Sequence, residues 1–157
     1  MTRASWMPSL VCMEGQTGGV DGGRSQVVVV DAANVVGSRP DGWWRDRVGA
    51  ARRLLTRLTA LQERLRDTDL VVVLEGAACR AVSGDGAPET GHVRVVLASG
   101  SGDDTIVSVT AEVVAQSQHP AVTVVTADRG LRQRVEPIGA TTTGPRWLLD
   151  QLDALSD

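Results

Sequence analysis

The sequence contains no lysine, no tyrosine and no phenylalanine, so arginine supplies every basic side chain and tryptophan every aromatic ring. The absence of lysine excludes mechanisms that depend on one, including Schiff-base chemistry, phosphate binding by a P-loop and catalysis by a receiver domain. Cysteine and histidine are scarce, with two of each and no metal-binding spacing, so neither a disulfide framework nor a zinc site is expected. This sparse use of cysteine favours a reducing, cytoplasmic compartment.

A long apolar run and a strong net charge are missing as well. No run approaches the ~20 residues of a membrane span, so no membrane partner is expected. The formal net charge of −3 excludes a polycationic nucleic-acid binder, although it is compatible with a nuclease whose acidic site and basic substrate surface offset each other. The P-loop and the GxGxxG fingerprint are both absent, so we expect no nucleotide cofactor.

Length and composition fit one globular domain, since the chain has 157 residues of which 42% are hydrophobic. Residues 1–25 are rich in glycine, and Pro8 and Glu14 interrupt their apolar stretches. They lack the continuous apolar core of a signal peptide, so we predict a flexible N-terminal tail. The domain itself is placed at residues 26–157.

Short runs rich in valine predict strands at residues 26–30, 69–75, 92–97 and 121–126. Residues 140–143, which are rich in threonine, are a candidate for a fifth strand. Apolar spacing and end signals predict helices at residues 44–66, 101–116, 129–136 and 146–155. We interpret residues 31–42 as a turn and residues 76–91 as a glycine-rich linker. Strands that alternate with helices indicate the α/β class, here a three-layer α/β/α sandwich around a central, mostly parallel sheet of about five strands.

Acidic residues follow the predicted strands closely. Asp31 ends the first strand, Glu75 the second and Asp128 the fourth, while Asp103 and Asp104 come shortly after the third. The carboxyl ends of parallel strands meet at one edge of a sheet, so these side chains are expected to converge. Close carboxylates repel one another unless cations neutralise them, and Mg²⁺ and Mn²⁺ prefer oxygen ligands. The pattern therefore predicts a metal site at this edge.

Each of these acids also has a local structural role open to it. Asp31 and Asn34 are residue types that build turns, and Asp128 is a suitable N-cap for the helix that follows. Ser101 and Asp104 have the spacing of a capping box. The repetition of acids at successive strand ends nevertheless favours a shared site, because turns alone do not require it.

The segments VVVVDAANVV, SGDDTIV and VVTADRGLR resemble the NYN domains of the PIN-like ribonuclease superfamily, and within it the YacP-like branch of bacterial proteins. The resemblance covers roughly residues 26–150. It implies a PIN-like sandwich with the strand order 3-2-1-4-5. It also implies a metal-dependent endoribonuclease that acts on RNA, with possible association with the ribosome.

The resemblance carries roles over to particular residues. Asp31, Asp103 and Asp128 match the family's metal-binding acids, and Asp104 matches an adjacent acid. Asn34 matches a residue that orients the site or contacts the substrate. The implied reaction is hydrolysis of a phosphodiester with one or two Mg²⁺ or Mn²⁺ ions and no side-chain nucleophile, and the sequence leaves the number of ions open. Glu75 stands where related members have an aspartate, as a further candidate ligand.

Tryptophan and arginine precede the first long helix. We expect Trp43 to stack on an unpaired base, and Arg45 and Arg47 to contact RNA phosphates close to the acidic edge. The alternative is that the tryptophans seal the start of the helix against the sheet. Arg129 and Arg132 follow the acid of the fourth strand, and they either reach the scissile phosphate or pair with the acids of the site.

Other features have simpler interpretations. Arg53, Arg57 and Arg64 share one face of the first long helix, where a solvated surface is favoured over a phosphate-binding one. Trp147 is expected to anchor the last helix by packing. A different class of function also remains open, namely a non-catalytic RNA- or ribosome-binding module, which would keep the arginines and not need the acids. Homodimerisation along one helix face is a further possibility.

Overall fold

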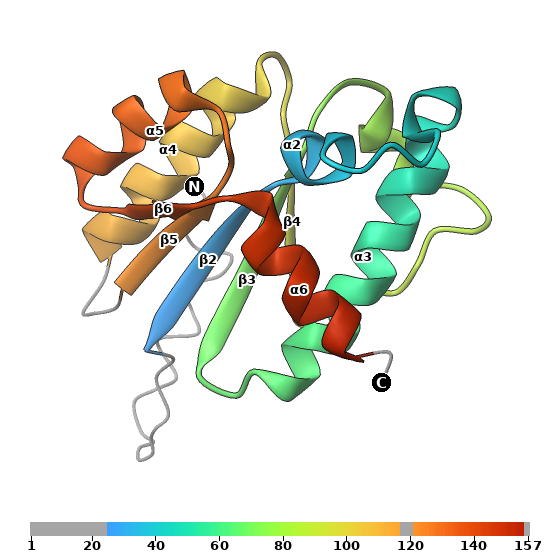
Figure 1. Cartoon of the computed structure of the whole chain (residues 1–157), viewed down its shortest axis with the longest axis horizontal. Coiled ribbons are helices and arrows are strands. Elements are labelled where there is room, and N and C mark those ends of the chain that lie inside the picture. Colours follow the sequence, from blue (N-terminus) through green and yellow to red (C-terminus); the bar gives the residue numbers. More distant parts are fainter. Residues whose placement is uncertain (1–24, 117–120, 156–157) are drawn as a thin grey trace.

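The computed structural model describes residues 25–116 and 121–155, so nearly all of the predicted tail at residues 1–25 lies outside the described residues. The described residues form one parallel sheet of five strands (Figure 1). These strands are β2 (Gln26–Asp31), β3 (Thr68–Leu74), β4 (Arg94–Leu97), β5 (Ala121–Val125) and β6 (Thr141–Thr143). Their order is β4-β3-β2-β5-β6, which is the order 3-2-1-4-5 expected for a PIN-like sheet.

Helices cover both faces of the sheet, as the α/β/α expectation requires (Figure 1). One face carries α2 (Ala32–Gly37), α3 (Arg47–Arg64) and α6 (Pro145–Leu155), and the other carries α4 (Gly102–Gln116) and α5 (Arg129–Val135). Three 3-10 helices complete the described elements, namely η3 (Trp43–Arg45), η4 (Gly76–Val82) and η5 (Glu136–Ile138). No helix in the described part of the chain is long and apolar enough to cross a membrane.

The central strand β2 shows why valine runs form this sheet. Val28 and Val30 pack into the core under α2, α3 and α6, whereas Val27 and Val29 pack under α4 and α5. Successive side chains of a strand point to opposite faces, so a strand covered on both faces has no polar position to offer. β-branched residues suit this doubly buried environment. The continuous run of valine therefore marks the strand whose carboxyl end lies in the middle of the sheet.

The chain between β2 and α3 differs from the predicted turn. Residues 32–37 form the short helix α2, in which Ala32 and Val35 are buried. Six residues are too few to show helical periodicity, and their valines favour strands, so the sequence pattern did not indicate a helix. The predicted helix at residues 44–66 is also divided, because η3 ends at Arg45 and the side chain of Asp46 caps α3 by accepting from the backbone N–H of Gly49 at 2.8 Å.

The predicted linker between β3 and β4 also contains structure. Its first half forms η4, which packs beside α3. The guanidinium of Arg52 holds this segment by donating to the carbonyl oxygens of Ala81 at 3.0 Å and Ser83 at 2.8 Å. The strand β4 begins at Arg94, two residues later than predicted, so His92 lies outside it.

Helix α6 packs differently from the prediction made for its tryptophan. Leu148 and Leu152 are fully buried against the sheet, whereas Trp147 is 40% exposed. The residue that anchors the helix is therefore leucine, and the prediction for Trp147 was wrong. At the far end of α6, Asp153 forms ion pairs with Arg39 at 2.8 Å and with Arg57 at 3.2 Å. These pairs tie the last helix to α3 and to the loop after α2.

We expect Asp153→Asn to lower the melting temperature slightly at neutral pH, because it removes both ion pairs. Hydrogen bonds from Arg39 and Arg57 lower the pKa of Asp153 below its ordinary value of 3.8. The stability that the carboxylate contributes is therefore present above pH 3.8 and is lost as the pH falls through the lowered pKa. Circular dichroism melts at several pH values should show the wild type and the variant converging in acid. An equal difference at every pH would contradict the prediction.

Candidate active site

The sheet order reverses between β2 and β5, and we call the region beyond the carboxyl ends of these two strands the crevice. The chain runs from β2 to β3 and β4 on one side, and then returns to β5 and β6 on the other. In open parallel sheets, ligands bind outside the carboxyl ends of the strands at the point where the order reverses. Here that point lies beyond Asp31 of β2 and the residues that follow Val125 of β5.

Asp31 is held firmly at this crevice. Its side chain is 8% exposed, and it caps α2 by accepting from the backbone N–H of Asn34 at 3.3 Å. Its other carboxylate oxygen accepts from the hydroxyl of Thr126 at 3.0 Å. Asp31 therefore has the local structural role suggested by the sequence, because it caps the segment after the first strand. It also lies at the crevice.

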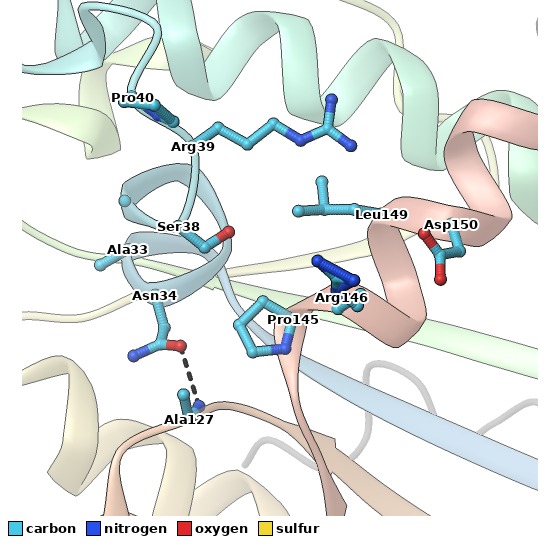
Figure 2. Close-up of a pocket in the computed structure, with 11 residues that line it drawn as sticks. Ala33, Asn34, Ser38, Arg39, Pro40, Ala127, Pro145, Arg146, Leu149 and Asp150 are labelled. Carbon is cyan, nitrogen blue, oxygen red and sulfur yellow. Dashed lines mark hydrogen bonds between the residues drawn. The ribbon is translucent and has the colours of Figure 1, made fainter.

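Two contacts join the ends of β2 and β5 across the crevice. The hydroxyl of Thr126 donates to Asp31 and accepts from the backbone N–H of Asp128 at 3.1 Å. The side-chain oxygen of Asn34 accepts from the backbone N–H of Ala127 at 2.8 Å (Figure 2). Thr126 is fully buried and was not predicted as a site residue, although it stands in the Thr-Ala-Asp segment that resembles the family. It positions two of the acids.

Glu75 and Asp103 complete the acidic edge from the side of β3. The carboxylate of Glu75 accepts from the backbone N–H of Gly102 at 2.6 Å, which is the first residue of α4. A side chain at Gly102 would place its first carbon 2.5 Å from that carboxylate, so a larger residue there would displace Glu75 from its present position. Asp103 follows in the first turn of the helix and is half-buried. Glu75 therefore fixes the position from which Asp103 faces the crevice.

Asp128 caps α5 by accepting from the backbone N–H of Leu131 at 2.9 Å. Asp104 is arranged differently, because its carboxylate forms an ion pair with Arg134 of α5 at 3.0 Å. Its backbone N–H donates to the Ser101 hydroxyl at 3.4 Å, so the contacts supply half of the predicted capping box. Asp104 is thus drawn toward α5, whereas its neighbour in sequence faces the other acids.

The pKa shifts show that the four remaining acids share one electrostatic environment. Burial raises the pKa of Asp31 most, and repulsion from Asp103 and Glu75 raises it further. The hydrogen bonds from Thr126 and Asn34 oppose this rise.

Asp103 behaves in the same way. Its pKa is raised first by partial burial and then by repulsion from Asp128 and Glu75, while Arg134 opposes the rise. The four carboxylates come from separate segments of the chain, and they are close enough to raise the pKa values of Asp31 and Asp103. Ionised together, they favour a cation in the crevice.

The donor set is chemically suited to a hard divalent cation, because it consists of carboxylates alone. Within residues 25–116 and 121–155, no three histidine, cysteine or acidic side chains are gathered closely enough to enclose a metal ion. Mg²⁺ usually keeps several waters and uses one or two carboxylates together with substrate phosphates, so it does not need such a cage. Each carboxylate also has lone pairs beyond those used in the hydrogen bonds above. The residues fit a hydrated Mg²⁺ or Mn²⁺ ion.

A cavity of about 270 Å³ opens beside Glu75, between α2 and the start of α3. Trp43 and Arg47 line it, and the Arg47 guanidinium lies 5.0 Å from the centre of the Trp43 ring. Trp44 meets the Trp43 ring edge to face with the centres 6.1 Å apart, and Trp44 is itself 50% exposed. Arg45 lies over the Trp44 ring at 5.8 Å. An aromatic ring and an arginine side chain therefore line a cavity next to the acidic edge.

The remaining predicted arginines fall into two groups. Arg132 donates to the carbonyl oxygen of Thr126 at 3.1 Å, and within residues 25–116 and 121–155 it forms no ion pair with the acids of the site. Arg129 is exposed beside Asp128. On α3, Arg57 is bound to Asp153. At least one arginine of α3 therefore has a structural role.

We expect Thr126→Val to lower the free energy of unfolding by about 1–3 kcal/mol, because it leaves a buried oxygen of Asp31 and the N–H of Asp128 without their partner. Valine has nearly the same shape, so packing is preserved. Thr126→Ser keeps the hydroxyl and should retain most of the stability lost by the valine variant. Urea denaturation measures both, and equal stability of the valine variant and the wild type would show that the hydroxyl is not needed.

This architecture is a three-layer α/β/α sandwich with the PIN-like fold, and it carries carboxylates at the switch point of the sheet. Its structural neighbours include Rae1 (YacP) from Bacillus subtilis, at a TM-score of 0.67 and 18% sequence identity, covering 83% of this chain and 75% of that chain. A crystal structure of a point mutant of Rae1 matches with a TM-score of 0.67 and 17% identity, covering 83% of this chain and 77% of that one. No protein-family model matches the sequence, and neither does any curated protein. The structural likeness confirms the YacP-like fold that the sequence segments predicted.

Proposed function

We propose that this protein is a metal-dependent endoribonuclease that hydrolyses RNA phosphodiester bonds at the crevice between β2 and β5. The observation that carries the proposal is the gathering of Asp31, Glu75, Asp103 and Asp128 from four separate segments at one edge of the sheet. The site has no lysine, and its acids lie beside an aromatic and arginine-lined cavity. Carboxylates without an adjacent nucleophile suit hydrolysis by activated water.

In the proposed reaction, Asp31, Asp103 and Asp128 would hold one or two Mg²⁺ or Mn²⁺ ions, with Glu75 adding negative charge and further oxygen donors. Asp104, which is paired with Arg134, would lie at the margin of this site. An ion held there would supply Lewis-acid chemistry, namely activation of a water and stabilisation of charge on the leaving oxygen. Thr126 keeps Asp31 and the segment of Asp128 in place.

The RNA itself is held by groups around the acids. The side-chain oxygen of Asn34 is used by the backbone of Ala127, which leaves its amide nitrogen to donate to a phosphate oxygen. Trp43 stacks on an unpaired base and Arg47 contacts a phosphate at the same cavity. Arg45, which lies over the neighbouring Trp44 ring, contacts a further phosphate. Arg129 is exposed next to Asp128, and we assign it to the scissile phosphate. Arg132 acts through its contact with Thr126.

Cleavage of a structured RNA with single-stranded loops tests the proposal. Wild-type protein is incubated with Mg²⁺, with Mn²⁺ and with EDTA, and products are separated on a denaturing gel. Cleavage that requires the metal and is lost in Asp31→Asn and in Asp103→Asn supports the proposal, provided that circular dichroism shows both variants folded. Absence of cleavage in either metal contradicts it.

A second candidate is a non-catalytic RNA- or ribosome-binding module on the same fold. The observation in its favour is that Asp31, Glu75 and Asp128 each accept a hydrogen bond that supports the fold, so the acids have a use apart from chemistry. This candidate predicts salt-sensitive binding to RNA or ribosomes, no cleavage, and no effect of the acid-to-amide substitutions on binding. Homodimerisation stays a prediction, and a size measurement in solution tests it.

We expect Trp43→Ala to weaken RNA binding by about 1–3 kcal/mol, the usual worth of one stacked base, which is roughly 5- to 150-fold in affinity. The matched control is Trp44→Ala, because Trp44 is adjacent and exposed but does not line the cavity. Fluorescence anisotropy with labelled single-stranded RNA measures both variants. Equal losses at the two positions would contradict a specific role for the cavity.

A further inference from the structure

A larger cavity of about 850 Å³ lies on the other side of α2, between this helix and α6 (Figure 2). Asn34, Ser38 and Arg39 line it from α2 and the loop that follows. Arg146 and Asp150 line it from α6, which begins just beyond the carboxyl end of β6. Among these residues, only Asn34 was predicted from the sequence as a site residue. The cavity opens at the edge of the sheet that carries the acids.

Shared residues connect this cavity with both the acidic crevice and the tryptophan-lined cavity. Asn34 and Ala127 line it, and they are joined by the hydrogen bond that crosses the ends of β2 and β5. Ala127 lies next to Asp128 in the chain. Ala33 lines the larger cavity and also the cavity of Trp43. The two cavities therefore flank α2, and the acids lie at the amino end of that helix.

The two arginines of the larger cavity differ in their availability. Arg39 forms an ion pair with Asp153, which offsets its charge. Arg146 is exposed, and within the described ranges no hydrogen bond or ion pair holds its side chain. Asp150 lies one turn further along α6 without an ion pair to Arg146 among the described contacts. A free guanidinium in the wall of a cavity that also carries Asn34 and Ser38 suits a phosphate, whose oxygens match its forked donors.

We propose that the cavity between α2 and α6 binds the RNA strand on the opposite side of the scissile phosphate from Trp43, with Arg146 contacting a backbone phosphate. This inference rests on the proposed function for the identity of the bound polymer. A strand that enters along Arg146 passes Asn34 and the acids before it reaches Trp43. With both cavities occupied, the protein binds the strand on both sides of the cleaved bond, as an endonuclease requires.

Binding of a labelled, unstructured RNA of about 12 nucleotides, in EDTA and at several salt concentrations, tests this inference. We expect Arg146→Glu to weaken binding at least tenfold. Arg146→Ala should reduce the slope of log affinity against log salt by about 0.7, the value for one phosphate contact with a single strand. Asp150→Asn should act in the opposite direction and strengthen binding, because it removes a negative charge from the same wall.

The matched control is the same pair of substitutions at Arg64. This residue lies in the last turn of α3, just before β3 begins, and therefore at the amino edge of the sheet. Losses at Arg146 that exceed those at Arg64 support the inference, and equal losses at both positions overturn it.

Cleavage assays separate this inference from the proposed function. If the wild type cleaves RNA but Arg146→Glu binds and cleaves like Arg64→Glu, the α2–α6 path is wrong and the nuclease stands. If the wild type binds RNA without cleaving it and Arg146→Glu still weakens binding specifically, the path stands and the nuclease is wrong. Failure of the wild type to bind RNA at any salt concentration overturns the path.

Discussion

Asp31→Asn is expected to reduce RNA cleavage by about 10²–10³-fold or more, the loss typical of removing one group that stabilises transition-state charge. The amide has nearly the same size as the carboxylate, but it carries no charge and is a poor ligand for Mg²⁺ or Mn²⁺. Asp31 stands at the switch point of the sheet, where its loss affects the site directly. The rate of cleavage under saturating metal measures the effect.

The same substitution should leave the protein folded with nearly unchanged stability. The backbone N–H of Asn34 and the hydroxyl of Thr126 each donate to one carboxylate oxygen of Asp31. An asparagine has only one side-chain oxygen, so one of these hydrogen bonds, worth about 1 kcal/mol, is lost. Against this, burial raises the pKa of Asp31, which means that the ionised carboxylate destabilises the fold at neutral pH. The two effects have opposite signs and largely offset each other.

The matched control for Asp31→Asn is Asp67→Asn. Asp67 precedes β3 at the amino edge of the sheet, so the substitution makes the same change in charge away from the crevice. Full activity in the control together with its loss in Asp31→Asn assigns the effect to the site. Comparable activity in both variants would show that Asp31 only caps α2.

The sequence predicted the sheet well because each strand carries its own signal. The valine run at residues 27–30 is buried on both faces, and that environment is specified locally by residue type. The acids after each strand were also predictable, since strand direction alone brings carboxyl ends together. The structure brings Asp31, Glu75, Asp103 and Asp128 into one environment on that basis.

Contacts between distant residues were not predictable in the same way. The hydroxyl of Thr126 reaches Asp31 across 95 positions of sequence, and Arg39 reaches Asp153 across 114. The sequence also does not indicate with which acid Arg134 forms an ion pair. In the structure it pairs with Asp104, whose carboxylate is therefore directed toward α5 and not toward the site of Asp103. We therefore expect Asp104→Asn to impair cleavage less than Asp103→Asn. The cavity between α2 and α6 escaped prediction because its walls come from opposite ends of the domain.

Mg²⁺ or Mn²⁺ should raise the melting temperature of the protein, because a cation in the crevice relieves repulsion among carboxylates. At a free metal concentration of 100 times Kd the stabilisation is about 2.7 kcal/mol. For a chain of this size that corresponds to a rise of roughly 5–10 °C. Differential scanning fluorimetry measures it without any substrate, and KCl at matched ionic strength controls for general screening.

The metal effect should depend on pH in a direction set by the acids themselves. The pKa values of Asp31 and Asp103 are raised, so stability from these groups is present below their ordinary pKa and is lost as the pH rises through the raised values. A cation binds only the ionised carboxylates, and the metal-induced shift should therefore be full at neutral pH and disappear as the pH falls through the same range.

Variants distinguish this site from other acidic surfaces. Asp31→Asn and Asp103→Asn should each reduce the metal-induced shift, whereas Asp67→Asn should retain it. An equal shift in all three variants would place the cation elsewhere and leave the acids of the crevice with their structural contacts only. A shift that is lost in the first two variants but kept in the third ties the cation to the crevice independently of any catalytic assay. Loss of cleavage in the same variants then has a chemical cause and does not reflect a failure to fold.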